Sequence, residues 1–240
     1  MKEINETHTN AWMKKSSFSS HVEGYICAIQ EEELQTNALK AKRMKDSEVN
    51  PFCRLCKCNK ETIQHVIACC PRLSASMYLP LRHNKVANII YQNIVYKSAN
   101  KDRQPIQTIY TDDDIEVWWD TKIQTLTPCQ HNKPDIILWK KDDKMCYVID
   151  ICICLDVNID KNINMKLDNY LPLTSELKRL YNEYSFKIIP AVIGATGLVT
   201  SHFTRMLKEL GVDDINEVVL KCQRNALLGT LKIVKSFLKM

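Results

Sequence analysis

The sequence predicts an α/β protein, in which helices flank a mixed β-sheet and a small helical, zinc-binding module precedes it. Three observations lead to this prediction. The segment 52–71 is rich in cysteine, two β-prone runs lie close together at 134–139 and 145–155, and segments with helical periodicity surround both features. Strands that alternate with helices are typical of a mixed α/β domain, which we expect over 105–240.

Length and composition support a protein with a substantial core. The chain has 240 residues, of which 45% are hydrophobic, which suits one large domain or a domain with a small module. It contains no run of 18 apolar residues and no apolar signal core at its beginning, so we expect a soluble intracellular protein without a membrane partner. The cysteine count of 11 is odd, which favours reduced thiols or metal ligands over disulfides.

The charge is unevenly distributed along the chain. The net charge is +5, yet the stretch from Lys40 to Arg103 holds 13 Lys or Arg against 4 Asp or Glu, a surplus of +9. The remainder therefore carries −4 (5 − 9). A basic front half suggests a phosphate backbone as partner, and a solvated lysine-rich surface is the alternative.

The first part of the chain is expected to form the helical module. Residues 1–20 are polar, and we expect them to be disordered. Apolar residues recur at helical spacing over 21–45 and again over 72–97, which predicts a helix in each. With the cysteine-rich segment these helices make a basic module over 21–104, and a polar linker is expected at about 97–107.

The second part is expected to form the α/β domain. Its first element is predicted to be a helix over 112–126, because acidic residues open this segment and acids favour a helix N-terminus. The two β-prone runs follow, joined by the charged turn 140–144. The remaining expected elements are a helix over 162–184, a strand over 186–194, a helix over 201–210 and a mainly helical tail over 213–238.

The cysteine-rich segment has the ligand spacing of a metal site. The order C-x2-C-x8-H-x4-C is provided by Cys53, Cys56, His65 and Cys70. Structural zinc takes four sulfur or nitrogen ligands in a tetrahedron, and a two-residue gap lets two thiolates hold one ion from a tight turn. Cys58 and Cys69 are competing thiolates, and a cluster of unligated thiols is the alternative.

Two acids mark the β-prone runs. Asp135 opens the first run and Asp150 lies inside the second, so pairing the runs as a hairpin would bring both carboxylates toward one end. Two neighbouring carboxylates repel each other unless a cation or a shared proton lies between them. Oxygen ligands suit Mg²⁺, so the pair predicts a magnesium site for phosphodiester cleavage. The alternative is a strand-end or turn carboxylate that caps neighbouring backbone, and Asp135 taken alone is more typical of that role.

Other polar residues could complete such a site. Lys166 and Tyr170 are four residues apart on a predicted helix and therefore share one face, from which the lysine could orient the attacking water and offset phosphate charge. Taken alone, Lys166 is more typical of a solvated residue and Tyr170 of a partly buried core aromatic. Asp156 is either a second acid or an exposed strand end. The triplet Arg82-His83-Asn84 could contact phosphate or simply lie on a helix surface.

In this order, the features resemble the C-terminal part of the polyprotein of site-specific non-LTR retrotransposons that carry a restriction-like endonuclease. In that family a CCHC zinc motif precedes an endonuclease of the PD-(D/E)xK superfamily. The resemblance extends from about residue 24 to 240. The stretches that carry it are 28–30, Cys53-Arg54-Leu55-Cys56, 61–66, Cys70-Pro71, Arg82-His83-Asn84-Lys85-Val86, Lys133-Pro134-Asp135-Ile136-Ile137, Val148-Ile149-Asp150-Ile151, Lys166 with Tyr170, and 192–197.

The resemblance implies a restriction-endonuclease-like sheet and a nuclear enzyme that nicks target DNA, whose freed 3′ end primes reverse transcription. Target DNA is then the partner, element RNA is a further candidate, and a homodimer on DNA is a candidate assembly. The implied site residues are Asp135 and Asp150 as magnesium ligands, Lys166 and Tyr170 as catalytic partners, Cys53, Cys56, His65 and Cys70 as zinc ligands, and Arg82, His83 and Lys85 as contacts to nucleic acid.

Two hypotheses of different classes follow. The first is a Mg²⁺-dependent DNA endonuclease with a structural zinc module. The second is a catalytically inactive, zinc-containing nucleic-acid-binding fragment, which is favoured slightly because Met165 and Asn169 replace an acid and a lysine often found in the family. The chain shows no recognisable polymerase motif, since Asp112-Asp113-Asp114 is expected to open a helix.

Overall fold

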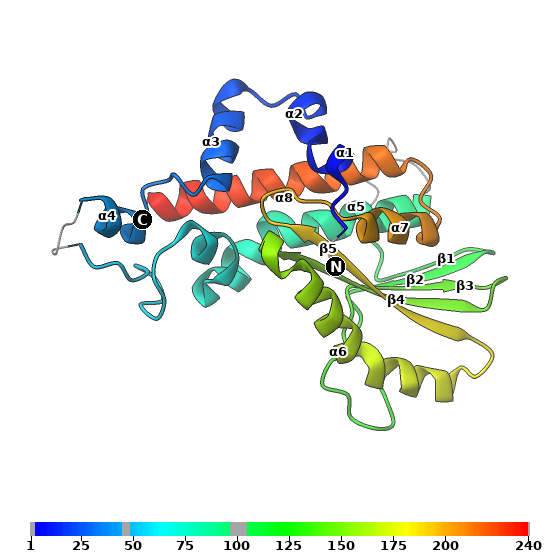
Figure 1. The fold of residues 1–240 in the computed structure, drawn as a ribbon. Coiled ribbons are helices and arrows are strands. Elements are labelled where there is room, and N and C mark those ends of the chain that lie inside the picture. Colours follow the sequence, from blue (N-terminus) through cyan, green and yellow to red (C-terminus); the bar gives the residue numbers. More distant parts are fainter. Residues whose placement is uncertain (1–2, 45–48, 97–104, 240) are drawn as a thin grey trace.

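Figure 1 shows the computed structural model of the chain, a five-stranded mixed sheet with helices on both faces and an N-terminal helical region. The structure describes residues 3–44, 49–96 and 105–239. The expected α/β class, with a mixed sheet flanked by helices and preceded by a helical region, is confirmed. Most of the linker expected at about 97–107 lies outside the described residues.

The strands follow one another across the sheet in the order β1-β2-β3-β4-β5. Their bounds are Ile109–Thr111, Ile115–Trp119, Ile136–Lys140, Met145–Cys154 and Ser185–Gly194. The first four pair antiparallel, and β4 pairs parallel with β5. A parallel pair needs a long crossover connection, which the helix α6 supplies between β4 and β5.

Helices make up most of the rest of the described chain. The α-helices are α1 (Glu6–Thr9), α2 (Ala11–Lys15), α3 (Ser20–Gln30), α4 (Asn37–Met44), α5 (Asn84–Tyr96), α6 (Ile159–Leu180), α7 (Ser201–Leu210) and α8 (Ile215–Leu238). Two further segments are π-helical, η1 (His65–Cys69) and η3 (Ser74–His83), and two are short 3₁₀ helices, η2 (Pro71–Leu73) and η4 (Asp156–Asn158).

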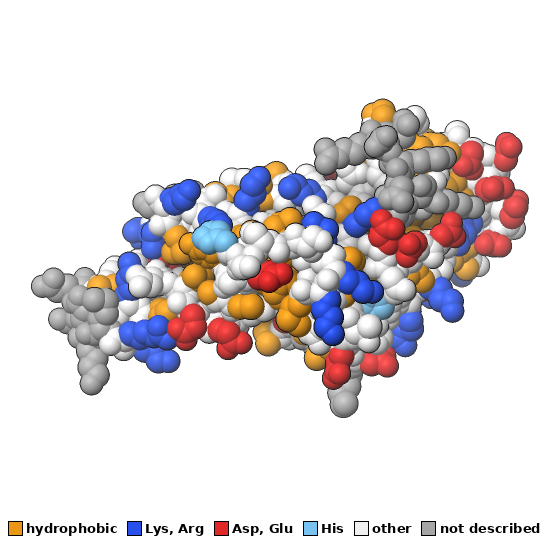
Figure 2. All heavy atoms as spheres, turned by 90° about the horizontal axis from the view of Figure 1, so that it is seen from above, with side chains coloured by type: hydrophobic (Ala, Val, Ile, Leu, Met, Phe, Trp, Pro, Cys, Tyr) orange, Lys and Arg blue, Asp and Glu red, His pale blue; other side chains and the backbone are white. Residues whose placement is uncertain are grey.

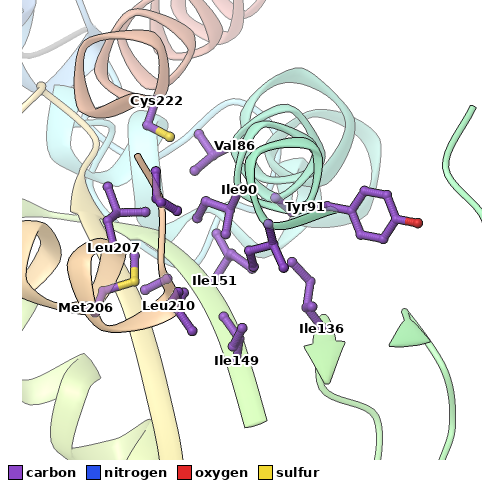
Figure 3. Packing of buried hydrophobic residues seen from close by; sticks show 14 of the residues in the cluster. Val86, Ile90, Tyr91, Ile136, Ile149, Ile151, Met206, Leu207, Leu210 and Cys222 are labelled. Carbon is purple, nitrogen blue, oxygen red and sulfur yellow. The ribbon is translucent and has the colours of Figure 1, made fainter. Parts of the chain in front are cut away.

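Alternation along β4 separates the two faces of the sheet. Ile149 and Ile151 belong to the core formed with α5, α7 and α8, part of which Figure 3 shows. Cys146 and Val148 point to the other face and pack under α6. Successive side chains of a strand point to opposite faces, so Asp150 lies on the α6 face.

The N-terminal segment differs from the expected disorder over residues 1–20. From Glu3 onward it is described, and it forms two short helices that pack on α8. Trp12 is buried, and the side-chain amide of Gln223 donates to the backbone carbonyls of His8 and Thr9. Local composition does not reveal these contacts, because one depends on burial of an aromatic side chain and the other on a polar partner 214 or 215 residues away in the sequence.

The prediction of a helix over 112–126 is wrong, because this segment contains a turn, the strand β2 and a loop. The Asp112 carboxylate accepts hydrogen bonds from the N–H groups of Asp114 and Ile115, so the acids close a turn between β1 and β2. The following Ile-Glu-Val-Trp-Trp run is β-branched and aromatic, which favours a strand. Its central residue, Val117, is fully buried against the sheet core.

The other expected elements are found with shifted bounds. The helix expected over 21–45 is divided into α3 and α4 by a loop. The helix expected over 72–97 consists of η2, η3 and α5, with Pro80 inside the π-helical part. The elements expected over 201–210 and 213–238 correspond to α7 and α8.

Candidate metal centres

The sheet register places the two acids side by side. Ile136 of β3 pairs with Ile149 of β4, so Asp135 and Asp150 are opposite each other one step beyond this pair. Directly opposed residues of an antiparallel pair lie on the same face, with Cβ atoms about 4.5–5.5 Å apart. The predicted pairing of the two runs as a hairpin is confirmed, and the carboxylates lie at one end of it.

The helix α6 supplies the partners of Asp150. The hydroxyl of Tyr170 donates to Oδ1 of Asp150 at 2.6 Å, and the ammonium group of Lys166 forms an ion pair with Oδ2. Because Lys166 and Tyr170 are four residues apart, they lie on the same face of the helix. The structure therefore brings together these two residues and the second acid.

The electrostatics of this site favour a cation. Burial and the neighbouring charge of Asp135 raise the pKa of Asp150, although Lys166 and Tyr170 oppose this shift. Burial disfavours the charge of Lys166, but the adjacent Asp150 raises the pKa of this lysine. The two neighbouring carboxylates repel each other, which favours a cation between them, and their oxygens are the ligand type that Mg²⁺ takes.

Asp135 is held by a backbone N–H group, which is the contact that the capping alternative expected, and by His83, which the sequence did not assign to it. Its Oδ2 accepts a hydrogen bond of 2.6 Å from the backbone N–H of Ile151 and lies 3.3 Å from Nε2 of His83. Burial disfavours protonation of His83, but its interaction with Asp135 outweighs burial and raises the pKa of the imidazole to about 9. The structure thus places His83 against the acid pair.

The other two predicted nucleic-acid contacts differ in exposure. The Arg82 side chain is only 1% exposed, with Nη1 donating to Thr230 at 3.0 Å and the guanidinium over the ring of Tyr78. Burial lowers the pKa of Arg82 to about 10. The predicted phosphate contact of Arg82 is therefore not available on this surface, whereas Lys85 is exposed.

Asp156 contacts the end of β5 and the loop that follows it. Its carboxylate accepts hydrogen bonds from the backbone N–H and the hydroxyl of Thr196. A Cβ on Gly194 would meet Oδ1 of Asp156 at 2.2 Å, so the carboxylate packs directly on the end of β5. These contacts tie the loop after β5 to the end of β4, which is a structural role.

A second centre lies in the N-terminal helical region. One ligand atom from each of four residues lies within 4.8 Å of all the others, and these residues are Cys53, Cys56, His65 and Cys70. The Sγ atoms of Cys53 and Cys70 are 3.9 Å apart, and Sγ of Cys56 is 3.3 Å from Nε2 of His65. Tetrahedral zinc with thiolate bonds of about 2.3 Å separates its sulfur ligands by about 3.7 Å. The cluster could hold a metal ion such as zinc.

The structure distinguishes between the competing thiols. Cys70 belongs to the cluster, whereas the neighbouring Cys69 is exposed and outside it. Cys58 is also exposed, and its thiol donates to the carbonyl of Cys56. Burial raises the pKa of the Cys56 thiol, but hydrogen bonds from the backbone N–H groups of Cys58 and Asn59 outweigh it and lower the pKa, which favours the thiolate.

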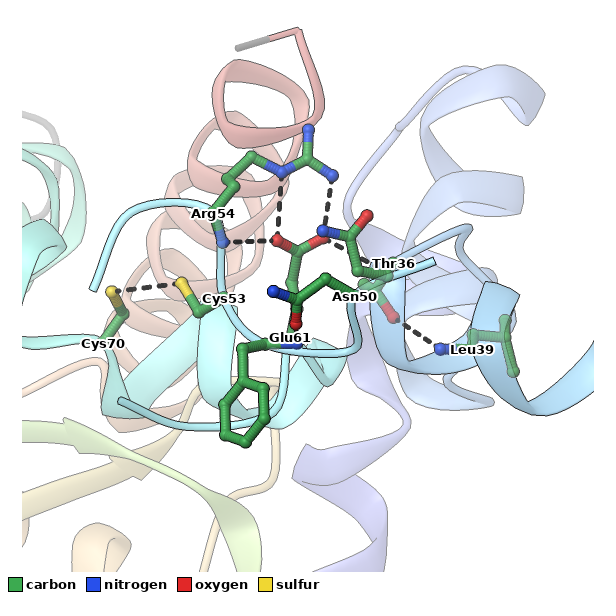
Figure 4. A network of polar contacts seen from close by, with 9 residues as sticks. Thr36, Leu39, Asn50, Cys53, Arg54, Glu61 and Cys70 are labelled. Carbon is green, nitrogen blue, oxygen red and sulfur yellow. Dashed lines mark hydrogen bonds and ion pairs between the residues drawn. The ribbon is translucent and has the colours of Figure 1, made fainter. Parts of the chain in front are cut away.

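A buried ion pair supports the cluster, and the sequence did not reveal it (Figure 4). Glu61 is completely buried and accepts three hydrogen bonds from Arg54, one from its backbone N–H and two from its guanidinium. It also accepts one from the backbone N–H of Asn37, where α4 begins. A glutamate within a basic, cysteine-rich segment was the only local signal. The pair fixes the loop between Cys53 and Cys56.

Figure 2 shows the face that carries α8 and the N-terminal helices. Asp and Glu side chains gather at the end of the molecule where the β-hairpins lie, and Lys and Arg side chains are scattered over the rest of this view. The exposed acids Asp112, Asp113, Asp114, Asp142 and Asp143 belong to the hairpin turns. A phosphate backbone would be repelled from that end.

No protein-family model matches the chain, and no curated protein matches it either. Within the described residues, none of the helices is both long enough and apolar enough to cross a membrane. The geometry of the two centres therefore carries the functional argument.

Proposed function

We propose that the chain is a metal-dependent DNA endonuclease with a restriction-endonuclease-like sheet and a structural zinc module. The observation that carries this proposal is the acid pair on one face of the sheet, with Lys166 and Tyr170 of the next helix directly on Asp150. A buried carboxylate whose pKa is perturbed by burial and by specific charged partners is typical of a functional site.

Each residue has a role in this proposal. Asp135 and Asp150 hold Mg²⁺, which when bound would polarise the phosphate and lower the pKa of a bound water. Tyr170 orients the Asp150 carboxylate through its hydrogen bond. Lys166 holds positive charge beside the acids, where it would offset the charge that develops on the phosphate.

The cysteine cluster would have a structural role. Structural zinc sites use four protein ligands and keep no open position, and three cysteines with one histidine complete such a set. A small loop region cannot bury enough apolar surface alone, so zinc would supply part of its folding free energy. The exposed Lys85 and the basic front half of the chain would contact the DNA backbone.

In the context of the resemblance to retrotransposon proteins, the substrate would be a chromosomal target and the protein would act in the nucleus. The nick would provide the 3′ end for target-primed reverse transcription by a polymerase. Element RNA and a second copy of the chain are candidate partners at that stage.

Nicking of supercoiled plasmid DNA tests the proposal. The zinc-loaded wild-type protein should convert the plasmid to the open-circular form when Mg²⁺ is added and not when Mg²⁺ is omitted. Asp150→Asn should reduce the rate by about 100-fold or more, because loss of a ligand should exceed the 10–100-fold effect typical of its outer-shell partners. Asp168→Asn is the matched control, since Asp168 is exposed on the same helix as Lys166. Nicking that survives Asp150→Asn would remove the site assignment.

The alternative is a catalytically inactive, zinc-containing nucleic-acid-binding fragment. It is favoured by Met165 and Asn169, which place no additional charged side chain beside Lys166 and Tyr170. Wild-type protein that binds DNA in a salt-dependent manner but leaves plasmid intact with both Mg²⁺ and Mn²⁺ would support this alternative.

A further inference from the structure

His83 joins the helical region to the acid-bearing strands. It is the last residue of η3, and the next residue begins α5. Its Nε2 lies 3.3 Å from Oδ2 of Asp135 and 3.2 Å from the carbonyl oxygen of Ile151. Its Nδ1 lies 3.0 Å from the side-chain oxygen of Asn84, which orients the ring from the opposite side.

These contacts fix the Asp135 carboxylate. The backbone N–H of Ile151 and Nε2 of His83 both approach the same oxygen, Oδ2. Among the described residues, Oδ1 of Asp135 has no hydrogen-bond donor, so its lone pairs remain for another ligand. A ligating carboxylate is usually hydrogen-bonded through its second oxygen in this way.

Two further observations argue against a surface role for His83. Its side chain is only 20% exposed, and both ring nitrogens have partners within the protein. Its neighbour Arg82 is buried against Thr230 of α8 and Tyr78, which anchors this part of η3. A rigid backbone on both sides is what a residue needs to hold another side chain in place.

We infer that His83 is a positioning residue that holds Asp135 in the metal-binding orientation, rather than a contact to nucleic acid. This inference rests on the proposed function, because it assigns His83 to the same site. It also gives η3 and α5 a role in the chemistry of a sheet to which they contribute no ligand.

Three variants separate this role from a DNA contact. His83→Leu removes the donor, His83→Gln can place an amide N–H near the position of Nε2, and Lys85→Ala removes an exposed charge two residues away. Each is compared with wild type for Mn²⁺ affinity by electron paramagnetic resonance, for affinity to a DNA duplex without added Mg²⁺ or Mn²⁺, and for thermal stability.

His83→Leu should weaken Mn²⁺ binding by about 10–100-fold, the usual effect of losing an outer-shell partner. His83→Gln should recover most of this loss, and DNA affinity without added Mg²⁺ or Mn²⁺ should remain within about twofold for both. Lys85→Ala should show the opposite pattern, with weaker DNA binding and unchanged Mn²⁺ affinity. If the imidazole has only a structural role, both variants should lose thermal stability, and His83→Leu and His83→Gln should have the same Mn²⁺ affinity.

The inference is overturned if His83→Leu binds Mn²⁺ as tightly as wild type does. If that variant also binds DNA more weakly than wild type, His83 is a DNA contact instead. If His83→Leu does not fold, His83→Asn replaces it, because its shorter amide does not reach Asp135. Asp150→Asn distinguishes failure of the proposed function from failure of this inference. If Asp150→Asn does not weaken Mn²⁺ binding, the proposed function is contradicted as well. If Asp150→Asn weakens Mn²⁺ binding but the His83 variants do not, only this inference is contradicted.

Discussion

The buried ion pair between Glu61 and Arg54 allows a quantitative prediction. In Glu61→Gln, an amide nitrogen replaces one carboxylate oxygen, so two of the four hydrogen bonds to this side chain are lost and a donor faces other donors. A hydrogen bond to a charged group contributes about 1.5–3 kcal/mol, and breaking a buried pair costs about 3–5 kcal/mol. The Arg54 side chain is 24% exposed, which lowers these values. We therefore expect a loss of about 2–4 kcal/mol in the free energy of unfolding.

Urea unfolding of the zinc-loaded protein measures this loss, with Glu33→Gln as the matched control. Glu33 pairs with Arg43, but both side chains are more than half exposed, so the control should change stability by less than about 0.5 kcal/mol. Equal effects of the two substitutions, or a change below about 0.5 kcal/mol for Glu61→Gln, would refute the reasoning.

The pH dependence of this loss gives a second test. Burial opposes ionisation of Glu61, but hydrogen bonds from Arg54 and Asn37 outweigh it and lower the pKa of the carboxyl group. A lowered pKa in the folded state means that the stabilisation is complete above the pKa of the unfolded chain and is lost as pH falls through the folded value. The difference between wild type and Glu61→Gln should therefore shrink in acid. A stability difference between wild type and Glu61→Gln that grows as pH falls would contradict a lowered pKa of Glu61 in the folded state.

Three further predictions test the packing and the cysteine cluster. Gly229→Ala should destabilise the fold by about 1–3 kcal/mol in thermal unfolding, because the added Cβ would lie 2.5 Å from the Cβ of Arg82. Gly24→Ala is the control: nothing lies within 4 Å of its added Cβ, so it should stabilise α3 by about 0.5–1 kcal/mol in the same assay. Trp12→Ala should lower the free energy of unfolding by about 3–5 kcal/mol, and no change would mean that the N-terminal segment is undocked. Cys53→Ser should abolish stoichiometric zinc in elemental analysis, and Cys69→Ser should retain it. Retention of zinc by both would contradict the ligand set.

The sequence predicted the elements whose signal is local. The runs around Asp135 and Asp150 became β3 and β4, because apolar β-prone residues between turn signals leave few alternatives. The ligand spacing likewise predicted the cysteine cluster, since residue type and spacing are both visible in the chain. It did not separate Cys69 from Cys70, because adjacent residues differ only in the direction of their side chains.

The features that the sequence missed depend on distant residues. The acids at 112–114 suit either a helix start or a turn, and the pairing of β2 with both β1 and β3 selects the turn. Burial of Arg82 depends on α8, where Gly229 allows close approach to η3. The contact of His83 with Asp135 joins residues 52 positions apart, for which a polar triplet on a helix gives no signal.

Anomalous diffraction from crystals grown with Mn²⁺ tests whether Asp135 and Asp150 bind one divalent ion. We expect a peak between their carboxylates, close to Lys166, and its loss in Asp150→Asn. Crystals that show Mn²⁺ elsewhere, with no peak at this end of the β3–β4 hairpin at saturating concentration, would contradict this expectation.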